Sequence, residues 1–549
     1  MDKIWLDSYS KNASFEINPD SYNSIVEVID ETCSKYQDRS AFINMDVEMT
    51  YGEVAQKSDA FANYLIEELK LKKGDVIMIQ MPNLLQYPVA LYGAFKAGLI
   101  VVNTNPLYTE REVKKVLKDS GAKAIVICSN FVSKLEAAMA DSKIEHVITT
   151  DIGDFFPFLK RNLVNFAIKY IKKMVPSYKG TYTSLNTAID RGSKLKASYP
   201  KLLNTDIALL QYTGGTTGKT KAAVLTHRNI IANMLQMAVW IKSGLGEGEY
   251  KVLAPLPIYH VFTFSVNILG FFYMGTTNLL ITNPRDLDSV IKDIKNHRPE
   301  VATIVNTLLQ ALLNHQEFQK LDLSYMKLSV AGGMALKVAV KKKWEEITKS
   351  SVVEGYGLTE ASPVVTCNPV DGRDIAGSIG IPLPSTDIKI VDEQENELGL
   401  NEEGELCVKG PQVMQGYWKQ EEETAKTFTK DGWLKTGDFA CIDEKGFVKI
   451  LDRKKDMIVV SGFNVYPNEV EEVLLELDGV QDVAAIGVDN EKSGEVVKVF
   501  IVKNKEITKD DIKNFSKKNL AGYKVPKEIE FRDELPKNNV GKVLRRELR

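Results

Sequence analysis

Cysteine is scarce in this sequence, and the few cysteines lie far apart. The 549 residues include five, at positions 33, 128, 367, 407 and 441, and no two of them form a C-x-x-C pair. An odd number of scattered cysteines argues against a disulfide framework and offers no cluster for zinc. We therefore expect free thiols in a reducing cytoplasm.

Two further absences concern targeting and net charge. The N-terminal segment MDKIWLDSYSKN lacks the apolar run that a secretory signal needs. Lys and Arg together number 70 against 73 Asp and Glu, a net charge of -3, so the chain has no basic excess that would favour nucleic acid as a partner. We expect a cytoplasmic protein that does not bind nucleic acid.

Residues 252–284 contain no Asp, Glu, Lys or Arg. The apolar stretch 261–281 within them is long enough to span a bilayer. Asn267, Gly270 and the polar run 275–278 interrupt it, however, and divide it into a helix-length piece, a glycine turn and a short strand. The pattern therefore predicts a buried helix followed by a strand at 278–281, in preference to a membrane span.

Residues 155–189 contain no acidic residue. Their first part, FFPFLKRNLVNFAIKYIKKMVPSYK (155–179), mixes bulky apolar side chains with Lys and Arg. A basic amphipathic helix of this kind can lie on an anionic membrane surface. It is equally typical of a surface helix with a solvated basic face, and the sequence leaves both interpretations open.

The order of strand-like and helix-like segments predicts an α/β protein with two domains. From about residue 75, short β-rich runs alternate with helical patterns, as in parallel-type sheets flanked by helices. Residues 386–450 hold short alternating strands instead, which predicts a small antiparallel β unit. Beyond them, helices are expected near 467–476 and 508–519, with strands near 482–488 and 497–503. We place a large N-terminal domain at 1–452 and a small α+β domain at 453–549.

A glycine-rich loop follows the strand predicted at 206–212. Residues 212–221 read YTGGTTGKTK, which resembles a Walker A loop but is one residue short, because Thr213 stands where G-x-x-x-x-G-K-[ST] requires its first glycine. A shorter loop can still bind phosphate oxygens through hydroxyls and glycine N–H groups. The alternative is a glycine-rich turn between two strands.

Further segments accompany this loop along almost the whole chain: LPIYH (256–260), GYGLTE (355–360), GELCVKGPQVMQGYW (404–418), GWLKTGD (432–438), LDRKKDMIVVSGFNVYPNEVE (451–471) and PKNNVGKVLRREL (536–548). Together with the loop they resemble, in the same order, the motifs of the adenylate-forming superfamily of acyl-CoA synthetases, luciferases and peptide-synthetase adenylation domains. The chain is most similar to bacterial long-chain fatty-acid:CoA ligases, down to MPNLLQYPVALYG and ITNPRD. It departs from the family at Thr220 and Ala222, where proline and glycine are usual.

The resemblance implies a two-step reaction and a set of residues for it. A carboxylate would attack ATP to give acyl-AMP and pyrophosphate, and coenzyme A would then take the acyl group. ATP, Mg²⁺ and coenzyme A are the implied cofactors and co-substrate. Lys542, Glu360 and Thr216 are the implied catalytic residues, the last two also for the metal. The implied nucleotide and coenzyme residues are Tyr212, Thr213, Gly214, Gly215, Thr216, Thr217, Gly218, Lys221, Gly355, Tyr356, Gly357, Thr359, Asp438, Arg453 and Gly462.

By the same resemblance, the C-terminal domain is mobile. It would rotate about Asp452, withdraw Lys542 from the site after adenylation and bring Gly462 to the pantetheine tunnel. Such hinges are a few linker residues that absorb a large dihedral change. Lys219, despite its Walker-like setting, has no part in this scheme, whereas Lys221 supports the phosphates.

The lack of any carboxylate in 252–284 bears on the substrate. An amino acid would leave its ammonium group unpaired in an apolar pocket, at high cost, so we expect a plain carboxylate with an apolar tail. Candidate pocket residues are His260, Val261, Phe262, Asn306, Thr307, Gly332 and Gly333. Ordinary core packing is the competing interpretation of these residues.

The sequence thus predicts a fatty acid–CoA ligase that works at the inner face of a membrane, which it would meet through 155–179. Three alternatives stay open: a fatty-acyl-AMP ligase that delivers to a carrier protein, a P-loop NTPase, and a lipid- or nucleotide-binding module without catalysis. A homodimer is compatible with the sequence, which gives no signal of oligomeric state or of chain-length preference.

Overall fold

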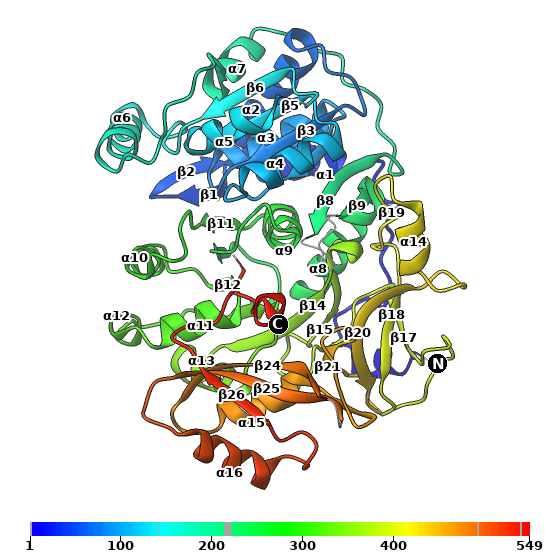
Figure 1. Ribbon diagram of the computed structural model, residues 1–549. Helices are drawn as coiled ribbons and strands as arrows, with labels where there is room; N and C mark the ends of the chain where they lie inside the picture. Colours follow the sequence, from blue (N-terminus) through cyan, green and yellow to red (C-terminus); the bar gives the residue numbers. More distant parts are fainter. Residues whose placement is uncertain (1–2, 141, 214–220, 491–492, 539–540) are drawn as a thin grey trace.

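The computed structural model describes residues 3–140, 142–213, 221–490, 493–538 and 541–549. Two large, mostly parallel sheets form the framework of its N-terminal part (Figure 1). The first, called here the β3 sheet, is parallel except at the edge formed by β8, β9 and β19. In spatial order its strands are β19 (Gly416–Tyr417), β9 (Lys221–Thr226), β8 (Ile207–Thr213), β4 (Ile100–Asn103), β3 (Val76–Gln80), β5 (Ala124–Cys128), β6 (His146–Thr150) and β7 (Thr183–Ser184).

The second, called here the β12 sheet, is parallel in its centre and antiparallel at both edges. In spatial order its strands are β16 (Ile381–Pro382), β15 (Val364–Cys367), β14 (Ser351–Gly357), β13 (Leu328–Ala331), β12 (Val301–Ile304), β10 (Lys251–Ala254), β11 (Thr277–Leu280), β1 (Ser40–Asn44) and β2 (Val47–Thr50). The strand predicted at 278–281 is thus confirmed, within about one residue, as β11.

Helices form layers between and outside the two sheets. The helices and helical turns of the N-terminal part are η1 (Ile4–Ser8), α1 (Ile25–Lys35), α2 (Tyr51–Asn63), η2 (Tyr64–Glu68), α3 (Gln86–Lys96), α4 (Glu110–Ser120), η3 (Ser129–Phe131), α5 (Val132–Ala138), α6 (Phe158–Phe166), η4 (Ala167–Ile171), α7 (Leu185–Gly192), α8 (His227–Leu245), α9 (Val261–Thr263), η5 (Phe264–Phe271), α10 (Leu287–His297), α11 (Asn306–Leu313), α12 (Gln316–Gln319), α13 (Val338–Thr348), η6 (Thr359–Ala361) and α14 (Glu421–Thr427). Local sequence fixes several starts, as in α4, where Thr109 and Glu112 form a capping box.

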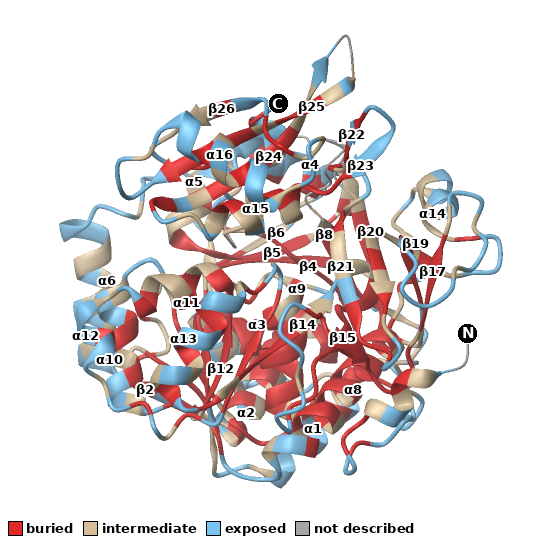
Figure 2. Ribbon diagram, turned by 90° about the horizontal axis from the view of Figure 1, so that it is seen from below, coloured by how far each residue is buried: buried red, intermediate tan, exposed pale blue. Residues whose placement is uncertain are grey.

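Alternation of side chains in the strands explains this layering. In β3, Ile77 and Ile79 join the central core while Val76 and Met78 face the outer core beneath α4 and α5. A strand buried on both faces reads as a continuous apolar run, which is why VIMIQM shows no polar alternation. Helix α3 lies in the central layer, and all its residues are buried (Figure 2).

The uncharged segment 252–284 belongs to this central layer. Its helical part, α9 and η5, is largely buried, and β11 follows the turn at Gly275. The predicted buried helix and strand are confirmed. Within the described ranges, no helix combines the length and apolar character that crossing a bilayer requires.

A smaller antiparallel sheet and a C-terminal α+β unit complete the fold. The antiparallel sheet, predicted at 386–450, contains β17 (Asp387–Val391), β18 (Gly404–Lys409), β20 (Leu434–Ile442) and β21 (Val448–Arg453). The C-terminal unit contains β22 (Ile458–Val460), β23 (Phe463–Val465), α15 (Pro467–Leu475), β24 (Val480–Asn490), β25 (Gly494–Lys503), α16 (Lys509–Asn519), β26 (Glu528–Phe531) and η7 (Arg545–Glu547). The expected domain boundary at 452 falls near the end of β21 and stays a prediction.

Candidate active site

A cavity of about 1020 Å³ lies where the C-terminal segment meets the large domain. Strands β8, β9, β13, β14, β15, β20 and β21 each supply lining residues, and so does the segment after β26. The cavity therefore brings together motifs that are more than 300 residues apart in the sequence. The sequence-predicted residues among its lining are Thr213, Lys221, His260, Val261, Phe262, Gly332, Gly333, Gly355, Tyr356, Gly357, Thr359, Glu360, Asp438, Arg453 and Lys542.

The flanks of the glycine loop are strands. Thr213 ends β8 and pairs with Lys221, which begins the antiparallel strand β9. A Walker A loop runs from a strand into a helix, so this setting differs from that of a P-loop. The predicted residues Gly214, Gly215, Thr216, Thr217 and Gly218 lie outside the described residues, and their roles stay predictions.

A hydrogen-bonded group of three side chains lies at one wall of the cavity. The Tyr356 hydroxyl, on β14, donates to Oδ2 of Asp438 at 2.6 Å. On the other side, Nε of Arg453 lies 3.3 Å from Oδ1 of Asp438, because these two residues are directly paired between β20 and β21. Burial and the Asp438 charge raise the Tyr356 pKa well above its usual range. The tyrosine is thus a neutral donor, and the carboxylate is an acceptor at the cavity wall.

A second chain of contacts connects Glu360 to the start of β9. The Tyr417 hydroxyl donates to Oε1 of Glu360 at 2.6 Å, and Nζ of Lys221 lies 5.0 Å from the centre of the Tyr417 ring. The same Nζ lies 2.6 Å from Oε2 of Glu423, on α14. Carboxylate oxygens are the ligands that Mg²⁺ prefers, so Glu360 at the cavity wall fits the implied metal.

Lys542 is held in a tight turn against the large domain. Its backbone N–H donates to Oδ1 of Asn538 and its carbonyl accepts from the Asn538 N–H, both at 2.9 Å. The preceding Gly541 has φ +86°, and a Cβ there would come within 2.5 Å of Oγ1 of Thr307. Glycine is therefore required for this close approach. Burial, with Arg453 nearby, lowers the Lys542 pKa to about 8.

The deep end of the cavity is apolar. Met237 of α8, Val330 of β13 and Cys367 of β15 line it, and each is at most 3% exposed. A Cβ on Gly332 would lie 3.3 Å from the Phe262 ring, whereas one on Gly333 would meet nothing within 4 Å. These glycines leave space that a larger side chain would fill.

His260 stands at the entrance to helix α9, where its Nδ1 accepts from the Phe262 N–H. Burial lowers the pKa of the His260 imidazole to about 4, so the ring is neutral at physiological pH. The His260 imidazole therefore adds no positive charge to this end of the cavity.

Five of the predicted residues that the structure describes are not among the lining residues. The Tyr212 side chain is buried in the outer core and donates its hydroxyl to Asp119, so it anchors β8 to α4. Asn306 is buried and its Oδ1 accepts from the Lys337 N–H, while Thr307 packs against Gly541. The remaining two are Asp452 and Gly462. In this arrangement α11 directs the two side chains toward Lys337 and Gly541, and their part in the acyl pocket stays a prediction.

Asp452 and Gly462 differ sharply in environment. Asp452 is 1% exposed and its carboxylate accepts from the N–H groups of Arg453 and Asn468, both at 2.7 Å. It therefore ties the end of β21 to the start of α15. Gly462 lies exposed in the turn between β22 and β23, away from the cavity lining.

Sequence reasoning missed several lining residues. Tyr417 stood inside a quoted motif without a role, and Met237, Val330 and Cys367 carry no motif, since buried apolar residues look alike in a sequence. The cluster of basic residues at the mouth was also missed, although LRRELR signals it. Its members are Lys435, Lys454, Lys455, Lys537, Arg546 and Arg549.

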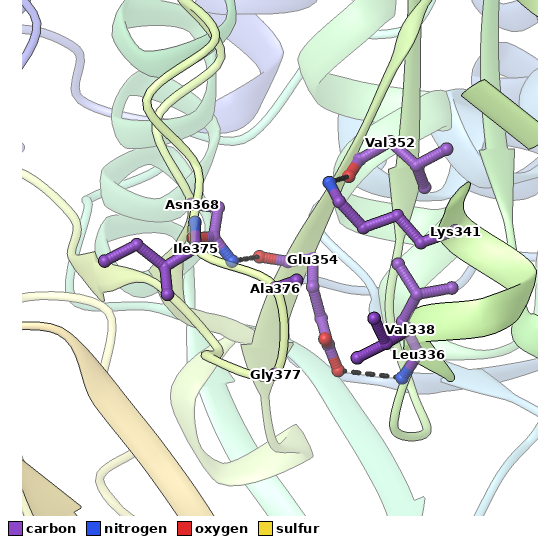
Figure 3. A pocket seen from close by; sticks show the side chains of 9 residues that line it. All are labelled: Leu336, Val338, Lys341, Val352, Glu354, Asn368, Ile375, Ala376 and Gly377. Carbon is purple, nitrogen blue, oxygen red and sulfur yellow. Dashed lines mark hydrogen bonds between the residues drawn. The ribbon is translucent and has the colours of Figure 1, made fainter. Parts of the chain in front are cut away.

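A small crevice beside the main cavity contains a buried carboxyl group (Figure 3). Glu354 directly precedes Gly355 on β14, and its Oε1 accepts from the Leu336 N–H at 3.0 Å. Burial raises the Glu354 pKa to about 8. Lys341, which also lines the crevice, donates to the Val352 carbonyl and pairs with Asp374. These contacts therefore connect β14 to the neighbouring segments.

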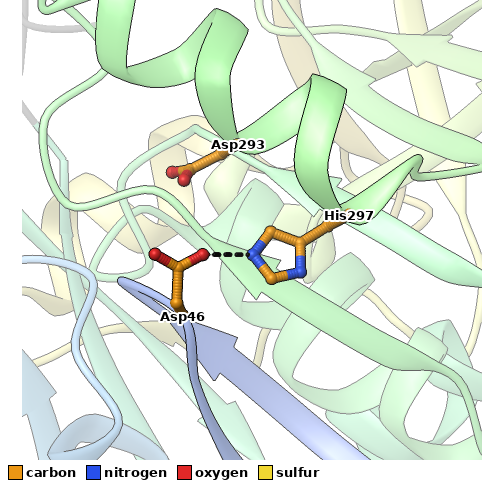
Figure 4. Close-up of side chains that lie close together, drawn as sticks. All are labelled: Asp46, Asp293 and His297. Atoms are coloured by element: carbon orange, nitrogen blue, oxygen red, sulfur yellow. Dashed lines mark hydrogen bonds and ion pairs between the residues drawn. The ribbon is translucent and has the colours of Figure 1, made fainter.

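One group of three potential metal ligands occurs in the described part of the chain, at Asp46, Asp293 and His297 (Figure 4). Nε2 of His297 lies 2.9 Å from Oδ1 of Asp46, a contact that ties the β1–β2 hairpin to α10. None of the three lines the cavity. The neighbouring Lys160 already contributes positive charge to Asp293. We regard this group as a structural contact.

Comparison with known proteins agrees with this site. Residues 29–418 match the AMP-binding enzyme family, and residues 469–542 match the AMP-binding enzyme C-terminal domain. The chain therefore belongs to the AMP-binding enzyme family.

The relatives found include enzymes named long-chain-fatty-acid–CoA ligase. The one from Salmonella typhimurium is 50% identical, with 100% of this chain and 98% of the relative covered. The one from Bacillus subtilis is 38% identical, with 100% and 97% covered. Among solved structures, ATP-bound MatB from Rhodopseudomonas palustris superimposes with a TM-score of 0.84 at 28% identity, covering 96% of this chain and 98% of that one.

Proposed function

We propose that the protein is an AMP-forming long-chain fatty acid–CoA ligase. It activates a fatty acid with ATP to acyl-AMP and pyrophosphate, then transfers the acyl group to coenzyme A. The observation that carries the proposal is the single cavity in which Lys221, Glu360, Asp438 and Lys542 meet above an apolar end. The full-length similarity to enzymes of this name supports the same conclusion.

The first step must bring two anions together, the fatty carboxylate and the α-phosphate of ATP. Lys542 at the cavity wall supplies positive charge between them, and its ammonium group suits the role because it is a mobile point charge. Lys221 and Thr213 stand where the β- and γ-phosphates would leave as pyrophosphate. Mg²⁺ bound at Glu360 would neutralise phosphate charge.

Nucleoside recognition is assigned to the group around Asp438. Its carboxylate is positioned by Tyr356 and Arg453, and it would accept hydrogen bonds from the ribose hydroxyls. The Tyr356 ring is a flat apolar surface suited to the adenine base. A carboxylate fixed from two sides is already oriented before the nucleotide arrives, which lowers the entropic cost of binding.

The acyl chain is assigned to the apolar end near Met237, Val330 and Cys367. Each buried methylene contributes about 0.8 kcal/mol, so affinity grows with chain length until the pocket is full. Neutral His260 adds no charge there. A plain carboxylic acid with an apolar tail is therefore the substrate class, and an amino acid is disfavoured.

One assay tests the proposal against its alternatives. The enzyme is incubated with ATP, Mg²⁺, palmitate and coenzyme A, and AMP, ADP, acyl-AMP and palmitoyl-CoA are measured. We expect AMP and palmitoyl-CoA in equal amounts. Acyl-AMP without thioester would instead indicate a ligase that serves a carrier protein, ADP would indicate an NTPase, and no product a binding module.

Peripheral membrane binding through α6 and η4 is the second part of the proposal. Phe158, Leu159, Leu163 and Ile171 are 68 to 82% exposed, and α6 and η4 contain no buried residue. Leu159, Leu163, Phe166 and Tyr170 follow the spacing of one helix face. Figure 1 shows α6 at the edge of the molecule, beyond the β3 sheet.

The orientation of this helix is the reverse of an ordinary surface helix. Its polar residue Asn165 faces the protein, where Oδ1 accepts from the Gly153 N–H and Nδ2 donates to Asp154. The apolar side chains of Phe158, Leu159, Leu163, Phe166 and Ile171 point to solvent, whereas Val164 packs against the core. The basic residues nearby are Arg161, Lys169, Lys172 and Lys173. An outward apolar face flanked by cations fits an anionic lipid surface.

Vesicle sedimentation tests this part. We expect the protein to bind vesicles that contain phosphatidylglycerol, and the variant Leu159→Ser/Leu163→Ser/Ile171→Ser to bind much less. Leu203→Ser, at another exposed leucine, is the matched control. Equal binding by all three proteins would overturn the assignment. A concentration-dependent dimer that the triple variant abolishes would assign the face to a second copy of the chain instead.

A further inference from the structure

Glu423 forms an ion pair with Lys221, the lysine that the proposed function assigns to phosphate binding. Its Oε2 lies 2.6 Å from Nζ of Lys221, and its Oε1 lies 3.2 Å from Nζ of Lys426. Both lysines line the cavity. The two ammonium groups lower the Glu423 pKa to about 2, so the carboxylate is charged throughout the working pH range.

The position of Glu423 is fixed by the short helix that carries it. Oγ1 of Thr424, the next residue on α14, accepts from the Tyr417 N–H at 2.8 Å, and β19 pairs Tyr417 with Ala223 of β9. The Tyr417 ring lies beside Lys221, and its hydroxyl is bound to Glu360. Glu423 and Lys221 are therefore held in register from two sides, by α14 and by β9.

A carboxylate in this place has an electrostatic consequence. Lys221 cannot pair closely with Glu423 and with a phosphate group at full strength, because the two anions repel each other. ATP or pyrophosphate must displace the carboxylate to use the lysine. When pyrophosphate leaves, the Glu423 carboxylate can re-form its ion pair with Lys221.

We propose that Glu423 is a positioning residue that competes with the β- and γ-phosphates for Lys221, and so weakens retention of pyrophosphate and speeds its release. This rests on the proposed function, in which Lys221 contacts those phosphates. The competition acts on ligands that carry the pyrophosphate group and leaves AMP unaffected, since AMP has only the α-phosphate.

The test compares Glu423→Gln with Glu422→Gln, a neighbouring exposed glutamate on the same helix with the same change of charge. Because the Glu423–Lys221 ion pair is partly exposed, we expect only a modest change: KM for ATP and the inhibition constant of pyrophosphate should each fall about fivefold in Glu423→Gln. The inhibition constant of AMP should not change. In Glu422→Gln all three constants should stay at the wild-type values.

A double-mutant cycle identifies the partner. In a Lys221→Gln background, Glu423→Gln should no longer tighten pyrophosphate binding. The proposal is overturned if Glu423→Gln leaves pyrophosphate binding unchanged, if Glu422→Gln produces the same shift, or if AMP binding tightens equally.

Lys221→Gln alone should weaken ATP and pyrophosphate binding. If it does not, the phosphate role of Lys221 fails, which is a separate result from failure of the competition. Glu423→Ala and thermal unfolding of each variant check that the folds are intact.

Discussion

Two edges of the C-terminal unit have opposite surroundings. The edge that carries Lys542 lies in the cavity wall, where Gly541 packs against Thr307 of the large domain. The edge that carries Gly462 is a solvent-exposed hairpin, and a Cβ on this glycine would meet no atom within 4 Å. One small unit thus displays two surfaces with predicted functions, and the structure brings the Lys542 surface to the cavity.

Polar contacts also join this unit to the large domain. Asp482 of β24 lies 3.8 Å from Nζ of Lys337 in the large domain. The Tyr466 hydroxyl donates to Glu403 at 2.8 Å. Such contacts contribute about 0 to 1 kcal/mol each. We propose that the two edges serve different steps of the reaction.

The largest expected effect comes from removing the cavity-side edge. In Lys542→Ala the charge beside the reacting phosphate is lost, and loss of one such group costs about 10²- to 10³-fold in rate. Adenylation, measured by fatty-acid-dependent pyrophosphate exchange, should fall by that factor. Thioester formation from supplied acyl-AMP should be largely kept. Equal loss of both steps would contradict the division between the edges.

Restricting the connection between the domains at Asp452 should affect the second half-reaction more than the first. Asp452→Pro fixes φ at the end of β21, so we expect roughly a 100-fold loss of thioester formation from acyl-AMP, which corresponds to a barrier higher by about 3 kcal/mol. Pyrophosphate exchange should suffer far less.

The matched control for this hinge variant is Asp452→Ala, because this substitution also removes the carboxylate that accepts from Asn468 but leaves φ free. If the alanine variant loses thioester formation to the same extent, the buried carboxylate matters and the hinge does not.

Much of this comparison could be predicted from the sequence, and the reasons differ between regions. The strands and helices of the C-terminal unit follow clear patterns, such as the capping box of Thr508 and Asp511 at the start of α16. The motifs at Glu360, Asp438 and Lys542 combine residue types with fixed spacing, and the structure brings all three residues to the wall of one cavity.

What escaped prediction depends on side-chain direction and tertiary packing. The sequence marks Asn306 and Thr307 as candidate pocket residues, but α11 directs their side chains toward Lys337 and Gly541. The Glu423–Lys221 contact joins residues 202 positions apart, and a glutamate in a charged helix gives no local signal of its partner. The register of β9 with β19 creates that contact.

A change at the exposed edge should have an intermediate effect. Gly462 has φ +84°, where an L side chain costs about 1 to 2 kcal/mol, so Gly462→Ala should disturb the hairpin and lower thioester formation about tenfold. Adenylation should be unchanged. Gly432→Ala is the matched control, because this glycine has φ +82° and equally open surroundings but lies in a turn of the large domain. If the control variant shows the same loss, general strain explains the effect.

The smallest effect is a pH dependence confined to the Lys542 edge. Burial and Arg453 lower the Lys542 pKa to about 8, and only the protonated ammonium can neutralise phosphate charge. Adenylation should therefore decline as pH rises through 8, and the protonated fraction falls about fourfold between pH 7 and 8.5. The kcat/KM for adenylation reports this group because it reflects the free enzyme.

The control variant for this pH dependence is Lys542→Arg. It should be slower, since guanidinium differs in shape, but its pH profile should be flat over this range because arginine stays protonated. A decline that persists in the arginine variant would assign the titration to another group, and a decline of equal size in thioester formation would remove the contrast between the two edges.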